Sequence, residues 1–225
     1  MRSFVLGLIS VLMLVTPARA QDDVQLWTAL SVNGPLGDDD NRFLLWFDAH
    51  ARYSEDVSRL GVSIIRPGVG YKVNNRLSVW LGYANVLSRA DGRDTLTDNR
   101  IWQQATYTLA RGPWGSISGR TRLEQRFLEA GDDTAHRIRQ TFRISKPLPN
   151  SKWTLTAWNE TFIHLNDTDS GIEAGYNQNR AFVGANVALS KKIKLEGGYL
   201  YNNIRRVGAP DSNNNNISIA LSAKL

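Results

Sequence analysis

The chain has 225 residues and a formal net charge of +6, and 42% of its residues are hydrophobic against 21% charged. This composition excludes disordered and collagen-like chains. Because the sequence contains no cysteine, disulfide frameworks, thiolate zinc sites and cysteine nucleophiles are excluded as well. The positive charge is small and scattered, so it does not indicate a nucleic-acid-binding protein.

The first twenty residues have the pattern of an export signal. Arg2 supplies a positive charge, an apolar run follows over 4–15, and small residues stand at Ala18 and Ala20, where signal peptidase recognises them. An apolar run of about twelve residues is too short to cross roughly 30 Å of hydrocarbon as a helix. We therefore expect cleavage after Ala20, which leaves 21–225 as a single domain.

The remaining sequence alternates between apolar and polar residues, which is typical of β-strands. Long polar connections, such as 165–177, alternate with short turns, such as 73–75. Short turns at one end and long loops at the other are characteristic of outer-membrane barrels. The predicted strands number eleven and cover about 24–33, 41–54, 59–72, 76–88, 99–110, 115–128, 136–146, 152–164, 178–189, 192–204 and 215–225.

Strand length and charge placement favour a membrane barrel over a soluble β-sandwich. A tilted membrane strand needs roughly 9–11 residues, whereas soluble strands usually have about 5–6. Arg120, Arg122 and Glu124 share one face of a single strand, and a barrel lumen would let such charges pair and meet water. We therefore predict an all-β fold, a transmembrane antiparallel up-and-down β-barrel of about 10–12 strands. A periplasmic sandwich or soluble barrel is the alternative.

The count of eleven conflicts with the even strand number of bacterial single-chain barrels. The sequence therefore suggests that one segment has been divided or merged, or that the first segment is not a regular strand. Ten or twelve strands would restore the parity.

The alternation also predicts which residues face the lumen. Leu81, Val183 and Leu195 are expected to face lipid, whereas Ser78 and Asn186 are expected to face inward. The predicted lumenal charges are ten basic and four acidic residues: Asp48, Arg52, Arg66, Arg120, Arg122, Glu124, Arg126, Arg137, Arg139, Arg143, Glu160, Arg180, Lys194 and Glu196.

These charges have two interpretations. In the first, carboxylates bridge arginines in a structural network that holds the strands in register. In the second, the positive excess lines a narrow pore that prefers anions. The i, i+2 spacing of Arg122, Glu124 and Arg126 would bring them near Glu160 and Glu196 only in a narrow barrel.

Catalysis and metal binding have weaker support. An outer-membrane lipid hydrolase would need a serine and a histidine; His164, next to a long loop, is the best candidate, but no serine lies in a nucleophile motif. The acidic loop segments 38–40, 132–133 and 167–169 lack the spacing of a calcium loop. We expect a protein that is not an enzyme, with no catalytic residues, cofactor or metal.

Short motifs in a fixed order run along nearly the whole mature chain. They are Trp27, Arg66-Pro67-Gly68-Val69-Gly70-Tyr71, Leu81-Gly82-Tyr83, Arg100-Ile101-Trp102-Gln103-Gln104, Arg122-Leu123-Glu124-Gln125-Arg126, Trp158-Asn159-Glu160, Gln178-Asn179-Arg180 and Glu196-Gly197-Gly198-Tyr199-Leu200. With these motifs the chain resembles the bacterial proteins of domain-of-unknown-function family 2490. This resemblance implies an outer-membrane β-barrel and no assigned activity.

Together, the sequence predicts a protein of unassigned biochemical role in the outer membrane of a Gram-negative bacterium. Its expected partners are the lipid bilayer and, during biogenesis, the outer-membrane assembly machinery, with no nucleic acid. The sequence does not determine the oligomeric state.

Overall fold

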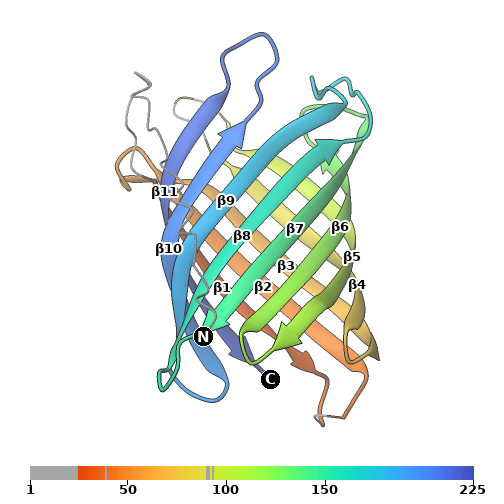
Figure 1. Ribbon diagram of the computed structural model, residues 1–225. Helices are drawn as coiled ribbons and strands as arrows, with labels where there is room; N and C mark the ends of the chain where they lie inside the picture. The colour runs from red at the N-terminus through yellow and green to blue at the C-terminus, as the bar shows by residue number, and fades with distance from the viewer. Residues whose placement is uncertain (1–24, 39, 90–91, 93) are drawn as a thin grey trace, which may run out of the picture.

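The computed structural model describes residues 25–38, 40–89, 92 and 94–225, so the predicted export signal at 1–20 lies outside the described residues. No described helix is long and apolar enough to cross a membrane. The described residues form eleven strands that close into a barrel (Figure 1). The strands are β1 (Gln25–Pro35), β2 (Phe43–Ser54), β3 (Arg59–Asn74), β4 (Leu77–Ser88), β5 (Leu96–Gly112), β6 (Gly115–Leu128), β7 (Thr134–Pro147), β8 (Trp153–His164), β9 (Gly175–Ala188), β10 (Ile193–Ile204) and β11 (Ser212–Lys224).

Each strand pairs with its sequence neighbours in antiparallel register, and the barrel closes where β1 pairs with β11 in parallel. An up-and-down barrel with an odd number of strands must close in this way, because its first and last strands run in the same direction. The predicted barrel and its eleven segments are therefore confirmed. The expectation that ten or twelve strands would replace the eleven is wrong, and β1 is a regular strand that pairs with both neighbours.

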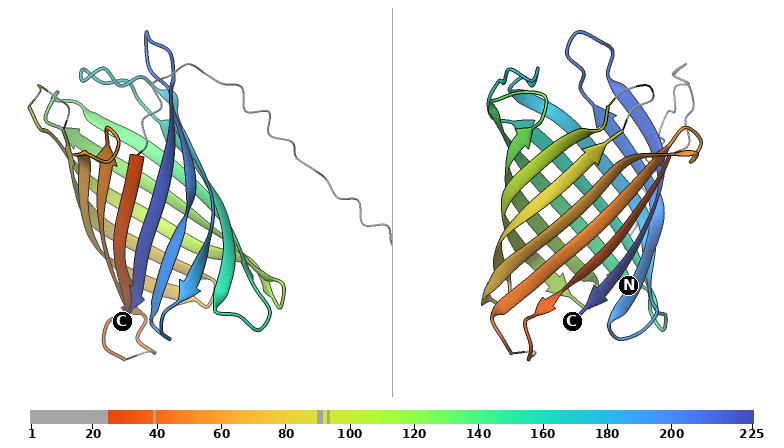
Figure 2. Two further views of the ribbon diagram at one scale, coloured as in Figure 1. Left: turned by 90° about the vertical axis from the view of Figure 1, so that its left-hand side faces the viewer. Right: turned by 180° about the vertical axis from the view of Figure 1, so that it is seen from behind.

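The connections divide the barrel into two different ends. Loops 129–133, 165–174 and 205–211 lie at what we call the long-loop end, and turns 75–76 and 113–114 lie at the opposite, short-turn end. As Figure 2 shows, β1 begins at the long-loop end and β11 finishes at the short-turn end. There the backbone N–H of Leu225 donates to the carbonyl of Asn33 at 3.2 Å, which extends the parallel pairing by one residue.

The apolar face of the sheet lies outside and the polar face inside, which is the reverse of a soluble protein. Leu81, Val183 and Leu195 lie on the outside with 52%, 60% and 37% of their surfaces exposed, as predicted, whereas Asn186 is buried inside. Ser78 lines an internal cavity, as predicted. Exposed outward positions are mainly large and apolar, whereas most of the strands' buried residues are polar or charged.

Aromatic rings lie against the inner wall where the sequence has glycine. Trp102 is fully buried beside Trp80, and its indole Nε1 donates to the carbonyl of Tyr83 at 3.0 Å. The ring occupies the space next to Gly68 and Gly82, where a Cβ would come within 2.5 Å and 2.2 Å of it. These strand glycines therefore let a lumenal tryptophan approach the backbone closely.

Replacing Gly82 with alanine should destabilise the barrel through overpacking. The added Cβ would lie 2.2 Å from Trp102 Cζ2 and 2.4 Å from the Pro67 carbonyl, which forces the wall to shift at a cost of about 1–3 kcal/mol. Gly197→Ala is the matched control, since the nearest atom to its Cβ would be the Ser218 carbonyl at 4.0 Å. The fraction of protein that runs as the folded band in gels, measured against urea concentration, gives the unfolding midpoint. This midpoint should be lower for Gly82→Ala and unchanged for Gly197→Ala. Equal midpoints would contradict this account of the packing.

Candidate functional site: the lumenal charge network

Glu124 on β6 is buried inside the barrel, with 1% of its side chain exposed. Its Oε2 accepts from Arg137 Nη2 at 2.6 Å and its Oε1 from Arg139 Nη1 at 2.7 Å. Arg100 Nη1 lies 3.7 Å from Oε2. A single carboxylate on β6 thus connects β5, β6 and β7 inside the barrel.

Glu160 on β8 has a similar environment and is 3% exposed. Its Oε1 accepts from Arg139 Nη2 and Arg120 Nη2, both at 2.8 Å, and Arg180 Nη1 lies 3.7 Å from its Oε2. Arg139 therefore bridges the two carboxylates, and the network of Glu124, Glu160 and their arginines extends from β5 to β9. Charge-assisted bonds of this kind are stronger than neutral ones.

Two residues of the network were absent from the predicted lumenal set. Asp98 Oδ2 accepts from Arg100 Nη2 and Arg126 Nη2, both at 2.6 Å. Asp98 was predicted to end a loop because the predicted strand began at 99, whereas β5 begins at Leu96. The alternation of Asp98 and Arg100 with Asn99 and Ile101 could have revealed the longer strand. Asp98 and Arg100 add one negative and one positive charge to the lumen, so the excess of basic over acidic lumenal residues does not change.

Smaller clusters complete the lumen. Asp48 accepts from Trp46 Nε1 at 2.7 Å and from Arg66 Nη1 at 3.4 Å, and His50 Nε2 lies 3.1 Å from its other oxygen. Nearer the short-turn end, Arg143 pairs with Glu196 in a partly exposed ion pair. Glu196 is thus separate from the network around Glu124, and of the two predicted carboxylate neighbours only Glu160 joins it.

Three predicted lumenal residues do not join a carboxylate among the described residues. Arg122 is fully buried over the Trp102 ring at 4.5 Å, and its Nε donates to Gln104 at 2.8 Å while both Nη atoms lack a partner. Arg52 lies 4.0 Å over the Trp27 ring. Lys194 is exposed near the short-turn end.

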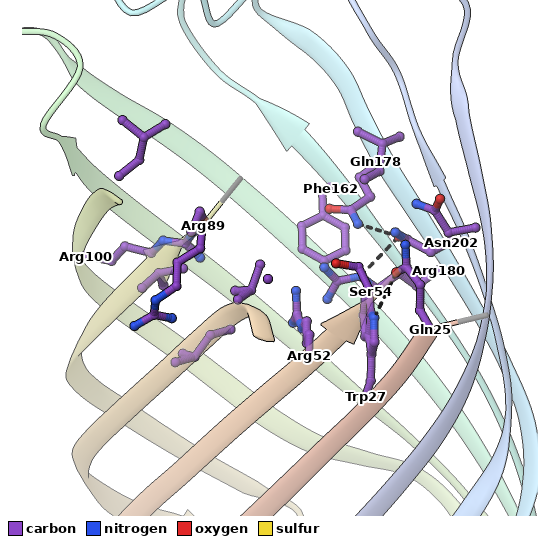
Figure 3. Close-up of a pocket in the computed structure, with 18 of the residues that line it drawn as sticks. Gln25, Trp27, Arg52, Ser54, Arg89, Arg100, Phe162, Gln178, Arg180 and Asn202 are labelled. Carbon is purple, nitrogen blue, oxygen red and sulfur yellow. Dashed lines mark hydrogen bonds between the residues drawn. The ribbon is translucent and has the colours of Figure 1, made fainter. Parts of the chain in front are cut away.

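Two cavities follow one another along the barrel axis. The upper cavity, of about 830 Å³, opens toward the long-loop end, and the lower cavity has about 690 Å³. Both are lined by Trp27, Arg52, Arg66, Arg139 and Arg180, which we call the junction. Figure 3 shows Trp27, Arg52 and Arg180 close together on the wall of the upper cavity.

The other candidate residues have structural partners. His164 Nε2 lies 3.3 Å from Arg126 Nη1. In the loops, the Asp169 carboxylate accepts from the backbone N–H of Asp132 at 2.8 Å and of Asp133 at 3.2 Å, which lowers the pKa of Asp169. Among residues 25–38, 40–89, 92 and 94–225, no group of three or more His, Asp or Glu could hold a metal ion. The acidic segments at 132–133 and 167–169 therefore join two loops to each other.

Glu124→Gln should destabilise the barrel strongly, because it removes the charge that Arg137 and Arg139 share in a fully buried site. Breaking one partner of a buried pair costs about 3–5 kcal/mol. Glu196→Gln is the matched control, and because the Arg143–Glu196 pair is partly exposed, its loss should cost about 1 kcal/mol or less. Thermal unfolding followed by gel mobility compares the two. A larger effect at Glu196 would refute the central role of Glu124.

The comparisons with known proteins agree on an uncharacterised family. The model of the family described as "Protein of unknown function (DUF2490)" matches residues 24–214. An uncharacterized protein of Methylorubrum extorquens is 34% identical over 199 residues, which is 86% of each chain.

Two solved outer-membrane proteins show distant similarity at 14% identity. The translocator domain of the autotransporter NalP from Neisseria meningitidis has a TM-score of 0.42, over 71% of this chain and 66% of that one. An anion-selective porin from Comamonas acidovorans has a TM-score of 0.38, over 81% and 57%. The family match and the Methylorubrum relative show that the chain belongs to the DUF2490 family of proteins of unknown function.

Proposed function

We propose that the protein is an outer-membrane β-barrel whose lumen is closed at mid-height by the arginine–carboxylate network, and that it is not an enzyme. The observation that carries this proposal is the burial of Glu124 and Glu160 inside the barrel, each surrounded by three arginines. In an open channel these groups would be wet. Their burial supports a barrel that is filled by its own side chains.

The outer surface supports a bilayer environment. Beyond its exposed apolar residues, its polar side chains pair with one another across strands. Gln103 and Gln125 exchange amide bonds of 3.0 and 3.2 Å, and Thr121 donates to Gln140, which donates to Tyr107. Such pairing matters in lipid, where an unsatisfied polar group costs several kcal/mol. The predicted export signal and the family resemblance support the outer membrane, with insertion by its assembly machinery.

A non-enzymatic role is supported by the surroundings of the histidines. A serine hydrolase needs a serine hydroxyl bonded to a histidine that a third group orients. His50 faces Asp48, a carboxylate already engaged by Trp46 and Arg66. No serine hydroxyl in the part of the chain that the structure describes is bonded to a histidine ring, and His164 faces Arg126.

A narrow passage that prefers anions is the second candidate function. The observation that favours it is the junction, because four arginines there line both cavities. Rearrangement of these side chains alone would connect the long-loop end to the short-turn end. Rings of arginine favour anions in pores.

The membrane-facing surface can be tested by charge insertion. Leu81 is exposed on the outside and Ser78 faces the lower cavity on the same strand. Leu81→Arg should cost roughly 2–4 kcal/mol if the site lies near the bilayer midplane, whereas Ser78→Arg should be milder. Refolding yield into lipid vesicles, scored by heat-modifiable gel mobility, measures both. Equal yields would contradict the proposed lipid-facing surface.

Planar-bilayer recordings test closure directly. The refolded protein should show no steady conductance, because the network blocks the lumen. Steady anion-selective current from the unmodified protein would instead establish the second candidate. Recovery of the protein in the soluble periplasmic fraction, without a heat-modifiable band, would refute both proposals and favour a soluble barrel.

A further inference from the structure

The upper cavity is lined by cations, whereas the carboxylates of the lumen lie behind them. Among the described residues, eight arginines line this cavity but only one carboxylate, Asp94. Glu124, Glu160 and Asp98 are buried and do not line it. The carboxylates therefore hold several arginines in place, and guanidinium groups face the cavity. This arrangement resembles a prepared anion site more than a neutralised core.

Arg52 is the least satisfied of these arginines. Among the described residues its side chain makes no hydrogen bond or ion pair, and its buried Nε lacks a partner. The charges that act on it most strongly are those of Arg66, Arg139 and Arg100, and all three are positive. A half-buried guanidinium with repulsive neighbours is costly unless an anion compensates it.

Two further arginines lie beside Arg52, and each has only a long contact to a carboxylate; Arg180 Nε also donates to Asn202 at 3.4 Å. Arg66 contacts Asp48 through one nitrogen at the long distance of 3.4 Å. Arg180 lies 4.9 Å over the same Trp27 ring that Arg52 covers, and its nearest carboxylate oxygen, on Glu160, is 3.7 Å away. Guanidinium forks match the geometry of phosphate and carboxylate oxygens. The Trp27 ring provides a fixed surface for two of the three groups.

We propose that Arg52, Arg66 and Arg180, around Trp27, form a binding site for a small soluble oxyanion that carries phosphate or carboxylate groups and enters from the long-loop end. The volume of the upper cavity, about 830 Å³, is in the range of small-molecule sites. The cavity opens along the barrel axis, so a soluble anion reaches it without leaving water. This site goes beyond the proposed closed barrel, because binding at equilibrium does not require conduction.

Calorimetric titration of the refolded protein with pyrophosphate and citrate, in a nonionic detergent at low salt, tests the site. We expect saturable binding of at least one anion with a stoichiometry of one. Arg52→Gln should weaken it roughly tenfold or more, since a charge-assisted hydrogen bond is lost. Arg143→Gln is the matched control, because Arg143 also faces the lumen but lines the lower cavity and not the upper one; it should change affinity less than threefold.

Thermal midpoints provide a second readout that does not depend on calorimetry. Without anion, Arg52→Gln should raise the midpoint, because repulsion from neighbouring arginines is removed. At one fixed anion concentration, the midpoint of the unmodified protein should rise by more than that of the variant, because the variant binds the anion more weakly. A structural arginine would give the opposite result, a lower midpoint in Arg52→Gln.

Three outcomes would overturn the proposal. The first is the absence of saturable binding of both anions to protein that has the folded-band mobility. The second is equal weakening by Arg52→Gln and Arg143→Gln, which indicates diffuse attraction to the lumen. The third is a thermal midpoint that rises when anionic lipid is added to the micelle but does not rise with either soluble anion. None of these results depends on conductance, so failure of the site is distinguishable from failure of the closed-barrel proposal.

Discussion

The bridge from Arg139 to both Glu124 and Glu160 is the interaction on which the interior depends. A buried carboxylate or guanidinium is costly to remove from water unless it is paired and hydrogen-bonded. Arg139 donates to both carboxylates at 2.7–3.1 Å, and Arg137 and Arg120 complete their environments. Because the partners come from neighbouring strands, the register of β6, β7 and β8 must be correct for any of these charges to be satisfied.

The alternation of the sequence predicted the strands and their facing well, because side chains in a strand alternate strictly between two faces. The closure of the barrel could not be predicted in this way. The face on which a side chain lies can be read within its own strand. Closure depends instead on the directions of the first and last strands, which follow from the number of strands. The eleven predicted segments were sufficient to imply a parallel β1–β11 pair. The expectation of an even number of strands, however, conflicted with the count of eleven.

Pairing inside the lumen was predicted only in part, for a related reason. Alternation assigns Arg122 and Glu124 to the same face, but not the distances across the barrel. Glu124 gathers arginines, while Arg122 lies between Trp102 and Gln104. The bulky rings were the missing information: Trp102 occupies the wall over Gly82 and so displaces Arg122 from the network. Asp98 was missed because the predicted strand began one residue after it, and predicted strand ends are the least reliable part of such patterns.

The excess of positive charge is not distributed evenly through the lumen. Arg122 is enclosed by side chains, whereas Arg52 faces both cavities at the junction. An anion bound at the junction would supply the negative charge that the surroundings of Arg52 lack, and would therefore stabilise the closed arrangement. Anion binding and anion conduction consequently oppose each other in this barrel, because the arginines that would attract the ion are the same ones that close its path.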